Sequence, residues 1–153
     1  MAELDVKPLR RKENRLSPLW TIVLLLAVAA AAVFGSAKLT WSSSTRTTDL
    51  RGTVTQAVSG EQLEVALVPI AVLLIASIAA VIATSGWVRR ALAVVPVAAG
   101  AIAIVLATRH LDGAFGAHPS GYPMTVVMVG HLLAALGGLA AIAAGALLAR
   151  FAA

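Results

Sequence analysis

Two long apolar segments separated by a short break constrain this chain more than any other feature. Residues 65–85 and 91–108 carry no charged side chain, and only residues 86–90 lie between them. Each segment has roughly 20 residues, the length that an α-helix needs to cross about 30 Å of hydrocarbon. We therefore predict a membrane-spanning helical hairpin that turns at residues 86–90.

The composition extends this prediction to the whole chain. Of the 153 residues, 59% are hydrophobic and 12% are charged, whereas soluble domains carry about 25% charged residues. Residues 19–37 and 124–149 form two further apolar segments. We predict an all-α integral membrane protein, a four-transmembrane-helix bundle in one domain at residues 19–151, after a basic tail at residues 1–18.

The basic residues predict the orientation of this bundle. Of the 12 Lys and Arg residues, eight lie in the tail, in the break at 86–90 or at Arg150, and four lie in residues 38–62 and 109–123. Cytoplasmic loops carry the excess of Lys and Arg, so both termini are expected on the cytoplasmic side of the plasma membrane. Residues 38–62 and 109–123 are then outer loops.

The net charge of +5 has a simple explanation in this setting. Basic residues that flank membrane spans orient the protein and contact anionic lipid headgroups. The chain has no basic face with interleaved aromatic residues of the kind that nucleic-acid binders use. We therefore expect the lipid bilayer, and not a nucleic acid, as the partner of these charges.

The first outer loop has the pattern of a small extracytoplasmic β-hairpin. Residues 40–47 and 53–58 are rich in Thr and Val, which favour strands, and turn-forming residues lie at 49–52 between them. We expect this hairpin to lie on the membrane surface between the first and second membrane helices.

The start of the second helix carries a capping signal and a proline. Ser59 and Gln62 have the spacing of a capping box, which predicts that the helix starts near Gly60. Within such a helix the Pro69 ring would clash with the carbonyl of Val65. We therefore expect a bend at Pro69, which is a candidate functional hinge.

The first apolar segment has two interpretations. A basic stretch, an apolar run and the small residues 35–37 also fit a cleavable signal peptide. The apolar run is long for a signal peptide, and Trp20 has the position of an interfacial anchor. We expect the segment to be retained as a helix, and cleavage stays open as the alternative.

The fourth apolar segment is rich in small residues at four-residue spacing. Such rows let helix backbones approach closely. They are Gly130, Ala134 and Gly138, and Gly137, Ala141 and Gly145. They predict helix packing within the bundle or between copies, hence a possible homo-oligomer or larger membrane complex, without naming a partner.

Three aromatic or titratable residues are candidates for a functional role. His131 lies inside the fourth span, where ionisable groups are functional candidates by default; the alternative is a neutral histidine bonded to a neighbouring helix or to water. Trp41 and Trp87 lie where spans meet their flanks, which favours interfacial anchoring. For Trp41 a ligand-stacking role in the outer loop is the alternative.

Signals of enzymatic chemistry are weak. The chain has no cysteine, and it lacks nucleophile-elbow and phosphate-loop patterns. His110, Asp112 and His118 could in principle form a two-histidine, one-carboxylate metal set, but all three lie in one glycine-rich loop. We expect ordinary solvated loop residues there, with no enzyme activity, cofactor or metal.

Several short motifs resemble those of a known family. They are Leu39-Thr40-Trp41, Ser59-Gly60, Val68-Pro69-Ile70-Ala71 and Gly86-Trp87. Over residues 21–150 the chain resembles the actinobacterial tryptophan-associated transmembrane proteins, small four-span proteins encoded beside tryptophan-biosynthesis genes. The resemblance implies a membrane location and a link with tryptophan metabolism through gene neighbourhood, and it defines no catalytic residues.

These observations favour a non-enzymatic accessory or structural membrane protein that acts through helix packing and its outer cap. The alternative is a small oligomeric transporter or exporter of an aromatic or other small metabolite. A transporter needs a polar-lined path and should depend on His131 or Trp41. An accessory protein needs a partner.

Overall fold

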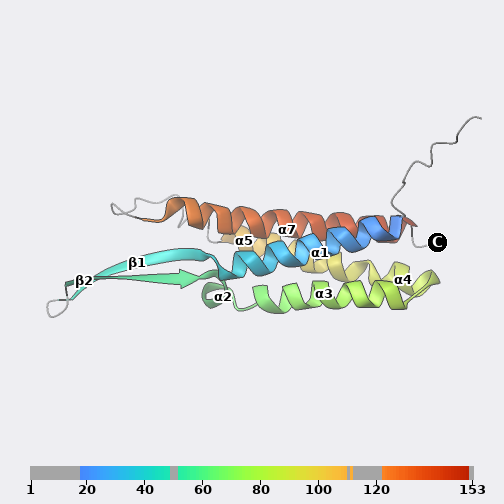
Figure 1. Ribbon diagram of the computed structural model, residues 1–153, viewed down its shortest axis with the longest axis horizontal. Coiled ribbons are helices and arrows are strands. Elements are labelled where there is room, and N and C mark those ends of the chain that lie inside the picture. Colours follow the sequence, from blue (N-terminus) through green and yellow to red (C-terminus); the bar gives the residue numbers. More distant parts are fainter. Residues whose placement is uncertain (1–17, 49–51, 110, 112–121, 152–153) are drawn as a thin grey trace, which may run out of the picture.

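The computed structural model describes residues 18–48, 52–109, 111 and 122–151. In chain order its elements are α1 (Pro18–Lys38), β1 (Thr40–Thr48), β2 (Gly52–Ser59), α2 (Gly60–Leu63), α3 (Leu67–Ala83), α4 (Gly86–Leu92), α5 (Val94–Arg109) and α7 (Met124–Phe151). The long helices lie side by side along the long axis of the molecule, and the β-hairpin extends beyond one end of them (Figure 1).

Three helical stretches are long and apolar enough to cross a membrane. They are Pro18–Lys38, Gly86–Arg109, which combines α4 and α5, and Met124–Phe151. Helix α3 is also apolar, but its 17 residues give a rise of only about 26 Å. The predicted membrane class is therefore confirmed, with three candidate spans and a fourth, shorter apolar helix.

Large and small apolar residues are distributed unusually between the inside and the outside of the bundle. Many buried positions hold alanine, such as Ala29, Ala103 and Ala134, whereas large residues such as Ile75, Leu132 and Leu136 are more than half exposed. In water such an apolar surface would be a liability. In lipid the outer side chains are solvated, and small inner residues let the helices approach closely.

The backbones of α5 and α7 approach closely where the two helices cross. Gly100 and Gly138 face each other there: a Cβ atom at Gly138 would lie 2.6 Å from the carbonyl oxygen of Gly100, and one at Gly100 would lie 2.4 Å from that of Gly138. Backbone atoms cannot move aside as a flexible side chain can. Only glycine therefore fits on both sides of this crossing.

The predicted hairpin is confirmed as a two-stranded antiparallel sheet. Strand pairing runs from Thr48 opposite Gly52 to Thr40 opposite Ser59, with an irregularity between Thr40 and Ser42. The residue at this irregularity is Trp41, and β-bulges commonly re-aim a side chain in this way. The sheet projects past the helix ends along the long axis instead of folding across them (Figure 1).

The predicted continuous second helix is wrong, because the segment forms two helices. The expected capping box is present, with Ser59 N donating to Gln62 Oε1 at 3.2 Å, but it begins the single turn α2. The chain then leaves helical geometry at Glu64, and α3 begins at Leu67. Pro69 is thus the third residue of a new helix, where the missing N–H has no helical partner to lose.

The predicted turn at residues 86–90 is also wrong. The chain turns at Thr84 and Ser85, and residues Gly86–Leu92 form α4. The Arg89 guanidinium folds back and donates from Nη2 to the carbonyl of Thr84. A basic side chain near the C-terminal end of a helix can satisfy a free carbonyl. Arg89, a residue of α4, thus caps the C-terminal end of α3.

Candidate functional site

Trp41 joins the hairpin to the helical bundle. Its indole is only 2% exposed, and its Nε1 donates to the carbonyl oxygen of Ser36, in the last turn of α1, at 3.0 Å. Trp41 is therefore buried within the protein, whereas an interfacial anchor exposes its ring to the headgroup region. Trp87 and Trp20, by contrast, are 80% and 60% exposed.

Two glycines make the space that the Trp41 indole occupies. A Cβ atom at Gly60, the first residue of α2, would lie 2.7 Å from Trp41 Nε1. A Cβ atom at Gly130, in α7, would lie 2.9 Å from the same nitrogen. The indole is thus held between two helices at positions that admit no side chain.

Ser36 connects this contact to α7. While its carbonyl accepts from Trp41, its hydroxyl donates to the carbonyl oxygen of Gly130 at 2.8 Å, and the residue is fully buried. One serine therefore links the end of α1, the bulge of β1 and the backbone of α7.

His131 also packs against the indole. The two ring centroids are 4.3 Å apart with an interplanar angle of 31°. His131 Nδ1 lies 2.8 Å from the carbonyl oxygen of Val127. Because a carbonyl can only accept a hydrogen bond, Nδ1 must carry the proton, and in the neutral ring Nε2 is left with a free lone pair.

The Nε2 atom of His131 has no hydrogen-bond partner within the described part of the chain. The side chain is 3% exposed, and no described residue donates a hydrogen bond to Nε2. An unsatisfied buried acceptor costs about 1–3 kcal/mol. We call Ser36, Trp41, Gly60, Gly130 and His131 together the hairpin anchor.

The other small residues of the predicted rows face partners within the same chain. Gly137 lies against Ala32 and Val33 of α1, and Gly145 lies against Val97 and the carbonyl oxygen of Ala93. Ala134 and Ala141, like Gly138, are buried. This placement leaves none of these residues free to contact a second protein.

The remaining candidates are Pro69 and the suggested metal set. Pro69 is exposed at the start of α3. The suggested metal set of His110, Asp112 and His118 lies outside the described residues, and no group of three metal-binding side chains occurs within them.

The comparison with known families decides the class of the protein. Residues 23–153 match the family described as tryptophan-associated transmembrane protein. The chain belongs to this family. The match confirms the family resemblance and, together with the apolar helices, a multi-pass membrane protein. No curated protein and no solved structure matches the chain.

For this tryptophan-associated transmembrane protein, sequence reasoning selected two anchor residues for function, His131 and Trp41. It assigned Gly130 to helix packing only, and it missed the roles of Ser36 and Gly60, which it assigned to a cleavage site and a helix start. No local signal could have found the two glycines together, because Gly60 and Gly130 lie far from Trp41 in the sequence. A large indole can be buried only where its neighbours lack side chains.

The anchor is built for position more than for reaction. Its hydroxyl and indole donors are both bonded to backbone carbonyls, so neither is free to act as an acid or a nucleophile. What the arrangement does is fix the hairpin to α1, α2 and α7 with a defined direction. One group, His131 Nε2, is buried and accepts no hydrogen bond from the residues that the structure describes.

Proposed function

We propose that the protein is a non-enzymatic accessory or structural protein of the plasma membrane, which holds its β-hairpin outside the bilayer for contact with a membrane partner. The observation that carries this proposal is the burial of Trp41. A hairpin without an anchor would move freely, whereas this one is joined to three helices through a buried indole and two buried hydrogen bonds.

The proposed topology has four membrane crossings with both termini in the cytoplasm. Helix α3 is short, but Val72, Ile75 and Ile82 are exposed along it, as lipid-facing residues would be. The start of α1, helix α4 and the end of α7 share one end of the molecule, opposite the hairpin (Figure 1). Arg89, Arg90 and Arg150 therefore lie at the end assigned to the cytoplasm by the positive-inside rule.

The hairpin offers a polar surface to such a partner. Five consecutive residues of β2, from Thr53 to Ala57, are exposed, and β2 pairs only with β1 among the described strands. An unpaired strand edge presents backbone donors and acceptors to another chain. The hairpin can therefore bind by adding a strand, without any change in the bundle.

Recovery of a partner from the native membrane tests this function. We would isolate the tagged protein in mild detergent and determine its partners by mass spectrometry and its native mass. The matched variant replaces residues 43–57 by a short Gly-Ser turn and leaves Trp41 and Gly60 in place. Stoichiometric recovery of a membrane protein by the natural chain, lost in the variant, is expected. Recovery of a homo-oligomer alone would contradict the proposal.

No observation favours the transporter alternative. Among the described residues the buried polar side chains are Ser36, Ser77 and His131, and the two serines donate to backbone carbonyls. Close glycine contacts at Gly100, Gly138 and Gly145 leave no space between α5 and α7 at those positions. A single bundle therefore has no polar path in its described part.

A connection with tryptophan metabolism, and an actinobacterial origin, remain part of the proposal. Their support is the family's description and the resemblance given above. Growth of a deletion strain with and without tryptophan in the medium tests the metabolic connection. A growth defect that tryptophan relieves is expected, and equal growth of both strains in both media would contradict it.

A further inference from the structure

The two edges of the β-hairpin differ in how open they are. The exposed run of β2 extends from Gly52 to Ala57, and the main contacts of β2 among the described elements are with β1 and α2. Strand β1 also lies against α7, where Trp41 packs at Gly130. The outer edge of β2 is therefore the more open of the two.

The sequence of β2 lacks the features that keep strand edges from pairing. Natural edge strands are commonly protected by charged residues, proline or a β-bulge. Strand β1 has Arg46 and the irregularity between Thr40 and Ser42. Strand β2 has no charged residue, no proline and a regular register from Gly52 to Val58. An edge of this kind favours the addition of a strand.

The side chains of β2 divide between the two faces of the hairpin. Alternation along a strand places hydroxyl and small residues on one face, and valines with a glutamine on the other: Thr53, Thr55 and Ala57, and Val54, Gln56 and Val58. Pairs of Thr with Thr or Ser, and of β-branched with aromatic residues, stabilise neighbouring strands. A matching strand therefore has Ser or Thr on one face, β-branched or aromatic residues on the other, and no charge.

We propose that the outer edge of β2 binds, by strand addition, an uncharged extended segment from the extracytoplasmic part of another membrane protein. This segment has Ser or Thr on one face and β-branched or aromatic residues on the other. Main-chain hydrogen bonds give the affinity, and the alternating side chains give the specificity. The inference rests on the proposed function, and it names the edge that binds and the class of segment that the partner supplies.

A second copy of the chain in the same membrane does not fit this edge. The hairpin extends along the long axis of the bundle (Figure 1), so the β2 strands of two equally oriented copies run in the same direction. A two-fold axis between them would lie along the strands and place each N–H opposite an N–H. A parallel ladder needs donors that face acceptors. The partner is therefore a different protein.

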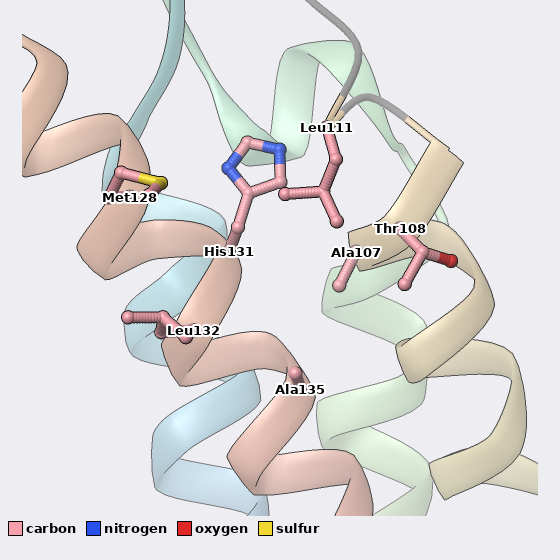
Figure 2. A pocket seen from close by; sticks show the side chains of 7 residues that line it. All are labelled: Ala107, Thr108, Leu111, Met128, His131, Leu132 and Ala135. Carbon is pink, nitrogen blue, oxygen red and sulfur yellow. The ribbon is translucent and has the colours of Figure 1, made fainter. Parts of the chain in front are cut away.

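The helix surfaces offer a partner little directional bonding. Figure 2 shows a pocket between α5 and α7, and its lining is apolar apart from Thr108 and His131. The Thr108 hydroxyl donates to the carbonyl of Val105 at 2.9 Å, and His131 is buried. Lipid chains can cover such a surface. The edge of β2 offers the backbone donors and acceptors that this surface lacks.

Photo-crosslinking along β2 tests the proposal. The photoreactive residue p-benzoylphenylalanine is placed at Thr53, Thr55 or Ala57, one position in each variant, and the full chain is irradiated in its native membrane. Mass spectrometry then identifies the crosslinked residue of the partner. Strand addition predicts three attachment points in one segment of one protein. They should advance by about two residues at each step, because side chains on one face of a strand recur at every second residue.

Lysine substitutions identify the edge that binds. Thr53→Lys combined with Thr55→Lys puts two charges beside the added strand, as protected edges do, and should lower recovery of the partner in mild detergent by roughly tenfold. The matched control combines Ser44→Lys with Thr47→Lys in β1 and should recover the partner as the natural chain does. All four residues are exposed, so the hairpin should fold in both variants.

Three results would overturn the proposal. Attachment points that are scattered over the partner, or that lie in a second copy of this chain, would show that β2 pairs with no strand of another protein. Equal recovery of the partner by the two double-lysine variants would place the contact elsewhere. In both cases, loss of the partner when residues 43–57 are replaced would leave the proposed function in place. Recovery of no partner by the natural chain would contradict both.

Discussion

At the residue scale, the anchor shows how a large aromatic side chain with one donor can be buried at the end of a membrane bundle. Away from water, the indole N–H needs a partner within the protein. The carbonyl of Ser36, in the last turn of α1, provides it and also accepts a hydrogen bond from the backbone N–H of Leu39 at 3.1 Å. The Trp41 donor is thus satisfied by a helix-end carbonyl that has a second donor beside it.

Substitutions of Trp41 should separate its packing from its hydrogen bond. Trp41→Phe keeps an aromatic ring against His131 and loses the bond to Ser36, at a cost of about 1 kcal/mol. Trp41→Ala also leaves a cavity and should cost about 3–5 kcal/mol. Unfolding by a denaturing detergent in mixed micelles measures both. Equal stability of the two variants would contradict the packing described here.

Substitution of Gly130 by a residue with a side chain should destabilise the protein, whereas the same substitution of Gly35 should be tolerated. In Gly130→Ala the new methyl group would lie 2.9 Å from Trp41 Nε1, and Gly60 blocks the indole on another side. Overpacking of this kind costs about 1–3 kcal/mol. In Gly35→Ala the nearest atom is a flexible Leu133 methyl group at 3.4 Å, so its melting temperature should stay close to that of the natural chain. An equal loss in both variants would show that the effect is not specific to the anchor.

The sequence identified His131 and Trp41 as candidates, but not their environment. Trp41 follows a membrane segment, and such tryptophans usually face the interface. Its burial depends on Gly60 and Gly130, which are 19 and 89 positions away in the chain. Contacts over such separations follow from the fold and are invisible to a pattern in one segment.

At the element scale, the end of α3 and the start of α4 show where the predicted helical hairpin of residues 65–108 differs from the structure. The apolar runs predicted the positions of the helices well, because the length of an apolar run indicates the length of a membrane helix. The turn was predicted at residues 86–90, because these residues separate the two uncharged apolar segments. In the structure Gly86 adopts a positive φ of 64° at the first position of α4. Arg89, which lies within α4, donates a hydrogen bond to the carbonyl of Thr84 at the end of α3.

Both Pro69 and Pro96 occupy the third position of a helix, α3 and α5 respectively. A proline there interrupts no helical hydrogen bond. Pro69→Ala should therefore change stability by less than about 0.5 kcal/mol, as exposed substitutions generally do. Pro96→Ala should cost more, because Pro96 is buried. Thermal unfolding of both variants checks this, and a large loss for Pro69→Ala would support the hinge that the sequence suggested.

Helix α1 should be present in the mature protein. Its Leu26 and Val33 are fully buried, and Ser36 supplies two bonds of the anchor, so cleavage at residues 35–37 would remove part of the core. The intact mass of the protein purified from its native membrane should include residues 18–38. A mass that begins after residue 37 would establish the signal-peptide alternative instead.

At the scale of the whole molecule, the bundle is held by close backbone contact inside and by lipid outside. The membrane class and the β-hairpin were predictable from the sequence, because the length of an apolar run and a cluster of strand-favouring residues are local properties of the chain. The pairing of helices was not. Rows of small residues predicted close contacts, but only the structure shows that Gly138 meets Gly100 and that Gly137 meets α1.

The most direct test of the membrane arrangement uses the absence of cysteine from the chain. Single cysteines at Ser44, Ser85 and Thr108, all exposed, mark the hairpin, the turn after α3 and the end of α5. Intact cells are treated with a membrane-impermeant maleimide, and Leu139→Cys, exposed midway along α7, is the unreactive control.

The four-span arrangement predicts that Ser44→Cys and Thr108→Cys are labelled in intact cells, and that Ser85→Cys is labelled only after the membrane is made permeable. Labelling of Ser85→Cys in intact cells would show that α3 does not cross the bilayer. Protection of Ser44→Cys in intact cells would place the hairpin on the cytoplasmic side and contradict its proposed role outside the cell.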